Sequence, residues 1–516
     1  MTVRPVNPRR LRPYDRPPRR RRTLIPGSPG SAAIGFLVVA VLWFGVAAGL
    51  GALAVALRVI PPVRLEIPLG LFGWAFTFDP PRVQLAFINA TVYGWLTNAG
   101  FAAICFLTPR LVGRQLVAER WANVGLLLWN AALGGGITAL YVFETGPNAP
   151  LTALPWWIEG GLATGALLVT ASFVVTVAPA IRSAYISAWY AAVALLSLLG
   201  VVGAAAALSL VTELGFVSLP DVTIALGSLL LSRALEALWL VGIAVAVLYY
   251  VVPRATGNPL ASSGLAVLGW LLWLVLAPGS ALAPLIDVGV PYFVATMGAV
   301  ATLLLLIPAF LVVMNLLLTM RGRWTLALGA GTAAFALVAL VILLGTALLQ
   351  GVGALRAVSS FVGRTEWQNG AFVIAALGAY SIAMLALAEH AGPRLLRRAW
   401  GGGVLAAAQL WAAFGGATIA GVALIGAGLA EGSFLAQAAP PDAIAAGLMP
   451  YRAIAAAGMG LIGLAALGAL LDLFLLYTMA EPADHFTPVP GPEVVESPEA
   501  PPHAVASSPT PSAAGR

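Results

Sequence analysis

The stretch that decides the fold is residues 224–252, IALGSLLLSRALEALWLVGIAVAVLYYVV, in which only Arg233 and Glu236 are charged. At ~1.5 Å per residue, a helix of this length spans more than ~40 Å, whereas the hydrocarbon core of a bilayer is ~30 Å thick. An apolar segment this long, with so few charges, predicts a transmembrane helix.

The rest of the chain has the same character. Hydrophobic residues make up 60% of the sequence and charged residues 9%, whereas roughly 25% of the residues in a soluble globular domain are charged. The sequence therefore predicts an all-α membrane protein of about twelve transmembrane helices. The expected spans are 34–59, 83–108, 121–143, 160–180, 186–212, 224–252, 264–286, 292–319, 324–349, 368–390, 402–429 and 453–478.

Two tails flank the transmembrane domain predicted for residues 32–478. Residues 1–31 are rich in Pro and Arg, and residues 479–516 are rich in Pro, Ala, Ser and Glu, so both are expected to be disordered. The first apolar stretch is too long for the hydrophobic region of a signal peptide. The first helix is therefore expected to remain as a membrane anchor.

The placement of charge predicts the orientation. The net charge is +7, but the basic residues gather after the even-numbered helices, as the positive-inside rule requires, and not in the pattern of a nucleic-acid-binding surface. We expect a multi-pass protein of the plasma membrane, with both termini in the cytoplasm and no nucleic-acid partner. The basic loop residues are Arg110, Arg114, Arg120, Arg182, Arg254, Arg321, Arg323, Arg394, Arg397 and Arg398; acids of the opposite loops are Glu144, Glu159, Glu213, Asp221, Asp287, Glu431 and Asp442; exceptions are Arg58, Arg64, Arg82, Arg356, Arg364 and Arg452.

Several motifs follow one another in the order and spacing of a known membrane family. They are Tyr249-Tyr250-Val251-Val252-Pro253-Arg254 with Gly257-Asn258-Pro259-Leu260, then Pro291-Tyr292 with Pro308 and 315–319, then Glu366-Trp367, and finally Met449-Pro450-Tyr451 at the expected start of helix 12. From about residue 34 to 478 the chain resembles haem-copper oxidase subunit I, most nearly the catalytic subunit of the cbb-type cytochrome c oxidases. The resemblance implies a twelve-helix bundle, with haem and copper as the family's cofactors.

Catalytic members of that family hold two haems and one copper ion with six intramembrane histidines, and this chain has three histidines in total. His485 and His503 lie in the C-terminal tail, and His390 lies at the cytoplasmic end of helix 10. Imidazoles are the ligands that such centres need. We therefore expect neither haem nor copper to be bound and no residue to be catalytic.

The resemblance also identifies the positions from which the ligands are missing. They are Gln84 in helix 2, Arg233 in helix 6, Gly279 and Ser280 in helix 7 (Ala283 and Pro284 if a gap is placed differently), and Ala371 and Val373 in helix 10. The volume that the haems would take is expected to be filled by large side chains or closed by helix approach. Candidate fillers are Trp129, Trp239, Trp270, Trp273 and Phe372.

Arg233 and Glu236 are three residues apart and share one face of a helix. A charge deep in the membrane costs at least ~2.5–3.5 kcal/mol on insertion scales, so Arg233 is expected to have a partner. We interpret the two residues as an intramembrane ion pair on the side where the family holds copper. The alternative is a pair that reaches toward the outer interface.

Other polar residues of the predicted spans allow two interpretations. Asn89, Thr91, Thr97, Asn98, Asn130, Asn315 and Asp472 are expected to form interhelical hydrogen bonds, or alternatively to line a path for protons. Glu389 and His390 form a titratable pair at the cytoplasmic end, for which a proton-sensing role is the alternative to chance.

The function predicted from these features is that of a redox-silent scaffold or partner in a respiratory electron-transfer complex, in contact with the lipid bilayer and with other subunits. Two alternatives remain. One is an active oxidase-like or nitric-oxide-reductase-like subunit with atypical haem ligation. The other is a transporter or channel whose path runs between the pair Arg233–Glu236 and the polar residues of helix 2.

Overall fold

The computed structural model describes residues 25–59, 65–68, 75–143, 151, 154–286, 290–399 and 403–482. Twelve helices within this part of the chain are long and apolar enough to cross a membrane, which confirms the predicted fold class. They are Ser31–Val59, Pro80–Val112, Glu119–Val142, Trp156–Ser183, Ile186–Glu213, Asp221–Thr256, Ser263–Leu285, Tyr292–Thr319, Thr332–Gly353, Trp367–Leu396, Gly403–Ala436 and Pro441–Thr478.

Some of these spans are a single α-helix, and others combine α-helical segments with π-helical or 3-10 segments. In chain order they are α1 (Ser31–Val59), α2 (Pro80–Asn89), η2 (Ala90–Leu96), α3 (Thr97–Val112), α4 (Glu119–Val142), α5 (Trp156–Val177), η4 (Ala178–Ser183), α6 (Ile186–Glu213), α7 (Asp221–Ala234), η5 (Leu235–Leu240), α8 (Val241–Thr256), α9 (Ser263–Ser280), η6 (Ala283–Leu285), α10 (Tyr292–Leu304), α11 (Leu306–Thr319), α13 (Thr332–Gly353), α15 (Trp367–Phe372), η7 (Val373–Tyr380), α16 (Ser381–Leu396), α17 (Gly403–Ala436) and α18 (Pro441–Thr478).

Short elements connect the spans. Helices α12 (Trp324–Ala327) and α14 (Arg356–Val362) flank α13, strands β1 (Leu65–Pro68) and β2 (Ala75–Phe78) form an antiparallel hairpin, and β3 (Arg398–Ala399) pairs antiparallel with β4 (Glu481–Pro482). Several features discussed above lie outside the described residues: most of both tails, His485, His503, Arg64, Glu144 and Asp287.

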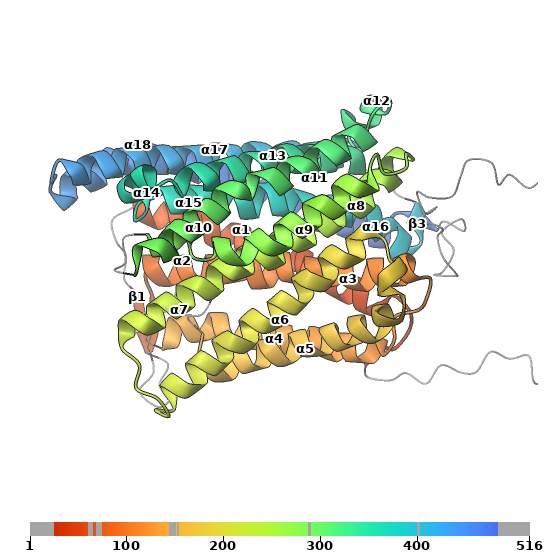
Figure 1. The fold of residues 1–516 in the computed structure, drawn as a ribbon, viewed down its shortest axis with the longest axis horizontal. Coiled ribbons are helices and arrows are strands. Elements are labelled where there is room, and N and C mark those ends of the chain that lie inside the picture. Colours follow the sequence, from red (N-terminus) through yellow and green to blue (C-terminus); the bar gives the residue numbers. More distant parts are fainter. Residues whose placement is uncertain are drawn as a thin grey trace, which may run out of the picture.

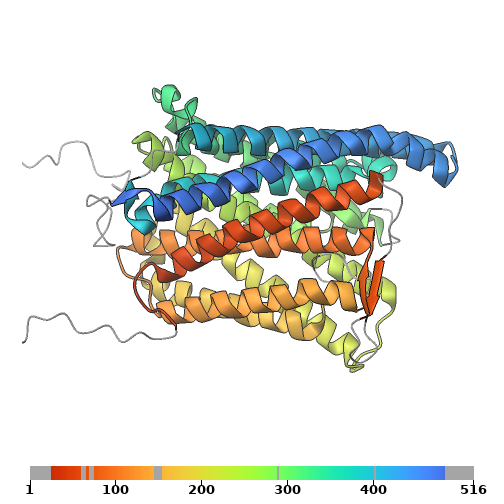
Figure 2. The same cartoon turned by 180° about the vertical axis from the view of Figure 1, so that it is seen from behind.

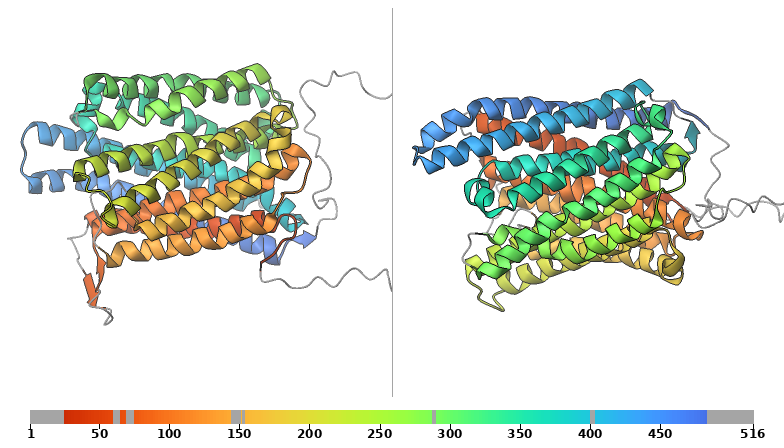
Figure 3. Two further views of the ribbon diagram at one scale, coloured as in Figure 1. Left: turned by 60° about the horizontal axis from the view of Figure 1, so that its bottom comes forward. Right: turned by 45° about the horizontal axis from the view of Figure 1, so that its top comes forward.

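The helices run side by side in one bundle (Figure 1). The start of α1 and the end of α18 lie at the same end, which we call the basic end, and β1 and β2 lie at the opposite end (Figure 2). At the opposite end, α17 and α18 project beyond all other helices (Figures 1 and 3). This projection agrees with their lengths of 34 and 38 residues, because about 20 residues suffice to cross a bilayer.

Three spans form the interior of the bundle: Pro80–Val112, Asp221–Thr256 and Trp367–Leu396 are more buried than the other nine. We call them the inner helices. Each contains a π-helical segment, respectively η2, η5 and η7. Such segments are rare in helices and occur frequently at functional sites. The residues that the sequence singled out in helices 2, 6 and 10 therefore lie on the three inner helices.

Three differences from the expected helices have a local physical reason. Met449-Pro450-Tyr451 does not open helix 12, because α18 already begins at Pro441, a favourable first helical position. Helix 9 begins at Thr332 and not at 324, because the glycines at 329 and 331 separate α12 from α13. Helix 8 divides at Leu305, because Pro308 has no N–H to donate to the carbonyl of Leu304.

Helices α17 and α18 pack closely through small residues, as expected from their glycine and alanine content. A Cβ atom added to Gly458 would lie 2.5 Å from the backbone nitrogen of Ala420, and one added to Gly416 would lie 2.7 Å from the carbonyl oxygen of Gly458. Glycine at these positions lets the two backbones approach directly.

Candidate functional site

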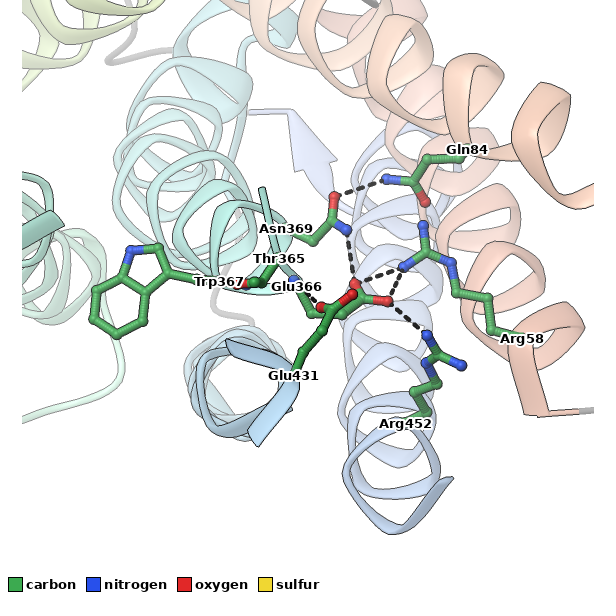
Figure 4. A network of polar contacts seen from close by, with 8 residues as sticks. All are labelled: Arg58, Gln84, Thr365, Glu366, Trp367, Asn369, Glu431 and Arg452. Atoms are coloured by element: carbon green, nitrogen blue, oxygen red, sulfur yellow. Dashed lines mark hydrogen bonds and ion pairs between the residues drawn. The ribbon is translucent and has the colours of Figure 1, made fainter. Parts of the chain in front are cut away.

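A buried carboxylate, Glu366, joins three parts of the chain at the opposite end of the bundle (Figure 4). Its side chain is 8% exposed. Nη1 of Arg58 in α1 donates to both carboxylate oxygens, at 2.7 and 2.9 Å, and Nη2 of Arg452 in α18 donates at 3.1 Å. Two guanidinium groups therefore hold one carboxylate in the turn that precedes α15.

The contacts continue on both sides of this carboxylate (Figure 4). Nδ2 of Asn369 donates to Glu366 at 2.7 Å, and the backbone N–H of Glu366 donates to Oε2 of Glu431 in α17 at 2.8 Å. Oδ1 of Asn369 in turn accepts a long hydrogen bond of 3.4 Å from Nε2 of Gln84 in α2. We call Arg58, Gln84, Glu366, Asn369, Glu431 and Arg452 the Glu366 network.

The arginines keep Glu366 ionised. Burial by itself raises the pKa of this carboxyl, but Arg58, the amide of Asn369 and Arg452 together hold the pKa below its ordinary value. Glu366 lies just before the span that begins at Trp367. At the opposite end, the network therefore joins helices that are far apart in the sequence through ion pairs and hydrogen bonds.

Sequence reasoning treated Arg58 and Arg452 only as exceptions to the charge pattern and Glu366 only as part of a motif. A signal was present in the sequence, because all three are charged residues at the edges of apolar spans and each needs a partner. Their pairing could not be derived from spacing, since Arg58 and Glu366 are separated by 308 residues.

The second polar group surrounds Glu236. Nη1 of Arg233, in the last turn of α7, lies 2.8 Å from Oε2 of Glu236 in η5. Nε2 of Gln350, in α13, donates to Oε1 of Glu236 at 2.7 Å. The Arg233 side chain is 35% exposed and that of Glu236 is 17% exposed. The structure therefore joins these two predicted residues and adds Gln350, which the sequence did not single out.

A cavity of about 60 Å³ lies beside this group, lined by residues of the spans Asp221–Thr256, Ser263–Leu285, Tyr292–Thr319, Thr332–Gly353 and Trp367–Leu396. Gln350 and Thr346 of α13, Tyr380 of η7 and Trp273 of α9 are among its lining residues. The Thr346 hydroxyl is buried and has no hydrogen-bond partner within the described part of the chain.

The other positions at which the resemblance predicts missing ligands carry small or apolar side chains. Gly279 and Ser280 end α9, and the Ser280 hydroxyl donates to the carbonyl of Ala277 at 2.7 Å. Ala371 lies in α15, and Val373 opens η7 and is 3% exposed. Gln84 belongs to the Glu366 network, and Arg233 belongs to the group around Glu236. These two residues therefore lie in two separate polar groups, and the other four positions lie in neither.

Tryptophans fill the interior between the inner helices. Trp129 and Trp239 are fully buried. Nε1 of Trp239 donates to the Thr97 hydroxyl at 3.0 Å, and Nε1 of Trp129 donates to the carbonyl of Tyr93 at 2.9 Å. The ring of Phe101 packs against both indoles, at centroid distances of 5.8 and 5.2 Å. These two of the expected fillers are therefore integral parts of the core.

The remaining expected fillers differ in burial. Trp273 is 3% exposed, and its Nε1 donates to the carbonyl of Ala237 at 2.9 Å, whereas Trp270 and Phe372 are only partly buried. Sequence reasoning missed Trp95, which is fully buried and donates from Nε1 to the hydroxyl of Ser381 at 2.7 Å. That bond joins two inner helices.

The polar residues of helix 2 bond to neighbouring groups. Asn98 and Asn130 exchange hydrogen bonds of 2.9 and 3.1 Å, and Trp43 donates to Asn130 at 2.8 Å. Thr91 donates to the carbonyl of Phe87, Thr97 accepts from Trp239, and Nδ2 of Asn89 donates to the carbonyl of Leu85. This pattern matches interhelical and local hydrogen bonding.

His390 is the only histidine among the described residues. It is 3% exposed and packs edge-to-face against Phe106 and Tyr250, at centroid distances of 6.2 and 5.7 Å. Within the described ranges, no group of three or more His, Cys, Asp or Glu side chains is arranged to hold a metal ion.

Comparison with known proteins gives three findings. The family model described as cytochrome c and quinol oxidase polypeptide I matches residues 31–461. No curated protein matches the sequence. Among solved structures, a chain of a haem-copper terminal oxidase dimer determined by cryo-electron microscopy superimposes with a TM-score of 0.71 and 15% identity, covering 89% of this chain and 86% of that one. At this identity the structural match speaks for the fold alone.

Proposed function

Because this chain belongs to the cytochrome c and quinol oxidase polypeptide I family, we propose that it is a redox-silent relative of the catalytic subunit, retained as a scaffold or partner in a respiratory electron-transfer assembly. It is a multi-pass membrane protein with the subunit I fold. The observation that carries the proposal is the position of His390, which is enclosed by aromatic rings at the basic end, while Gln84 lies in the Glu366 network at the opposite end.

The residues present do not fit haem or copper. Haem iron and copper in such centres need imidazole nitrogens, whereas the family's ligand positions carry an amide at Gln84, a guanidinium at Arg233 and small or apolar side chains elsewhere. The amide and the guanidinium are already bonded to Asn369 and Glu236. No step of electron transfer is therefore assigned to this chain.

The packing of the interior supports the same proposal. Trp95, Trp129 and Trp239 are all fully buried between the inner helices, and each donates its indole N–H to an acceptor of the chain. A large side chain that is both packed and hydrogen-bonded belongs to a stable core. The chain's own residues thus maintain an interior that its relatives build around cofactors.

The partners follow from the family and the surface. The lipid bilayer surrounds the twelve spans, and we infer that other subunits of a respiratory complex contact the bundle. From the arginines at the basic end we infer, under the positive-inside rule, that this end faces the cytoplasm and that the protein lies in the plasma membrane.

Of the two alternatives, transport lacks support because the polar residues of helix 2 bond to the protein itself. Atypical haem ligation through an imidazole would have to use His390, since it is the only histidine of the described bundle. That ring is 3% exposed and packs edge-to-face against Phe106 and Tyr250.

The test is haem and metal analysis of the full chain, purified from membranes of cells that are supplied with haem and copper. We expect much less than one haem and less than one copper per chain, by pyridine haemochrome absorbance and by elemental mass spectrometry. Stoichiometric haem would overturn the proposal. If that haem were lost in His390→Ala, atypical ligation through His390 would be the correct account.

A further inference from the structure

The cavity beside Glu236 has a mainly apolar wall. Val241 of α8, Leu305 between α10 and α11, and Leu343 of α13 all contribute to it. None of the described residues that line the cavity is charged. A charged ligand would therefore lose its hydration here without gaining an ion pair, so the wall favours a neutral and largely apolar molecule.

Small side chains leave this space open. Ala237, Ala309 and Ala347 border the cavity from three different elements, η5, α11 and α13. Pro308, which precedes Ala309, lies where helix 8 divides at Leu305. Protein interiors are otherwise closely packed. The cavity thus follows from the places at which these three elements carry alanine.

Thr346 supplies the hydrogen-bonding group of the cavity. The residue is 3% exposed, and its hydroxyl has no hydrogen-bond partner among the described residues. Most buried hydroxyls in folded proteins are hydrogen-bonded, and an unpaired one costs free energy. A bound molecule that forms a hydrogen bond with Thr346 removes this cost.

Thr302 provides an internal comparison. It lines the same cavity and is 8% exposed, but its hydroxyl donates to the carbonyl of Gly298 at 2.9 Å. Of the two threonines, only Thr346 therefore has a hydroxyl whose hydrogen bond a ligand would supply.

The volume limits the size of the ligand. An apolar cavity of ~150 Å³ binds benzene, whereas this cavity measures about 60 Å³. An aromatic ring is therefore too large, and a short aliphatic chain with one hydroxyl group is a better match.

The mouth of the cavity lies between α11 and α13. Ala309 and Ala347 line the cavity and are partly exposed. Each precedes a large apolar residue on the outside of the bundle, Phe310 at 49% and Leu348 at 48% exposure. Exposed apolar side chains on a membrane span face lipid. The ligand therefore enters from the bilayer.

We propose that this cavity is a binding site for a short-chain alcohol taken up from the bilayer. The alkyl chain lies against Val241, Leu305 and Leu343, and the hydroxyl forms a hydrogen bond with that of Thr346. Binding of this kind involves no metal or cofactor, so the inference does not depend on the proposed scaffold role.

Thiol protection in proteoliposomes tests the proposal, with 1-propanol as the probe. Ala347→Cys places a thiol at the mouth of the cavity, and native Cys105 is buried. We expect 1-propanol to slow the modification of this thiol by methyl methanethiosulfonate in a saturable manner. In Ala347→Cys/Thr346→Val the concentration that halves the rate should rise about fivefold, the loss expected from one neutral hydrogen bond.

The matched control is Ala347→Cys/Thr302→Val. It removes the other threonine hydroxyl of the cavity, which is bonded to the backbone, and should keep the half-rate concentration of Ala347→Cys. Absence of saturable protection in Ala347→Cys would overturn the proposal. So would a half-rate concentration that is unchanged by Thr346→Val, or one that rises equally in the control.

Thermal unfolding without alcohol distinguishes an empty site from an occupied one. Thr346→Val alone should leave the unfolding midpoint unchanged or raise it, because it removes an unpaired buried hydroxyl. A midpoint clearly below that of the wild type would show that a permanently bound water already pairs with Thr346, and it would overturn the proposal.

Discussion

Glu366 shows what one residue contributes to this bundle. It is a single carboxylate that forms ion pairs with two arginines from helices near opposite ends of the chain. A buried ion pair gives little net stability relative to an apolar replacement, but removal of one partner leaves the other charge uncompensated. Loss of this one carboxylate is therefore expected to weaken the packing of both α1 and α18.

Replacement of Glu366 by glutamine keeps the shape and removes the charge. We expect Glu366→Gln to lower the free energy of unfolding by about 2–4 kcal/mol, because Arg58 and Arg452 lose their counter-ion while they remain largely buried. Thermal unfolding in detergent measures the change. Asp442→Asn, an exposed acid on α18, is the matched control and should have almost no effect; equal midpoints for both variants would contradict the prediction.

The same carboxyl predicts how stability depends on pH. The folded-state pKa of Glu366 lies below its ordinary value, so its contribution is fully present above the unfolded-state pKa of ~4.3 and is lost as the pH falls through the folded-state pKa. The difference in unfolding midpoint between wild type and Glu366→Gln should be constant from pH 7 to about pH 5 and should shrink below about pH 4. A difference that grows on acidification would show that another group dominates.

In the apolar interior, Trp239 is the residue whose replacement is expected to lower the free energy of unfolding. Trp239→Ala leaves a cavity beside Phe101 and deprives Thr97 of its donor, so a loss of about 3–5 kcal/mol is expected. Trp411→Ala is the control, because Trp411 is 62% exposed on α17. Thermal unfolding of the two variants measures the loss of stability. Comparable losses in both variants would argue that Trp239 is not part of the core.

At the scale of elements, the α17–α18 pair provides the sharpest comparison. A methyl group at Gly458 would lie 2.5 Å from the backbone nitrogen of Ala420, whereas one at Gly460, on the same helix, would meet nothing within 4 Å. We expect Gly458→Ala to destabilise the bundle by about 1–3 kcal/mol through separation of the helices. Gly460→Ala should be neutral or slightly stabilising, because alanine favours the helix; a reversed order of the two unfolding midpoints would refute the packing argument.

The inner helices show how local sequence and packing combine. The hydroxyl of Ser381 donates to the carbonyl of Ala376, five residues earlier, and accepts from Trp95. This hydroxyl therefore bonds both to a carbonyl of a π-helical segment and to an indole of another helix, and it holds the two elements together. The apolar pattern predicted that helices 2 and 10 exist, but not that a π-helical segment interrupts each of them, because the pattern depends on composition and not on individual hydrogen bonds.

At the scale of the whole molecule, a core filled by side chains predicts independence from cofactors. Cells blocked in haem synthesis should yield the folded protein in the same amount, and with the same unfolding midpoint, as cells supplied with haem. The physical reason is that a group which does not bind the native state cannot stabilise it. A midpoint that rises with haem supply would contradict this expectation and the proposed function together.

The apolar segments alone were enough to predict the membrane class and the number of spans, because transfer of an apolar segment into a bilayer depends on that segment alone. The count of three histidines also led to the prediction that the family's metal centres are absent. Only the tertiary structure decided that Glu366 pairs with Arg58 and Arg452, that Gln350 joins Arg233 and Glu236, and that Trp95 reaches Ser381. These contacts join residues far apart in the chain, and they form only when the helices pack, which no local pattern of residues specifies.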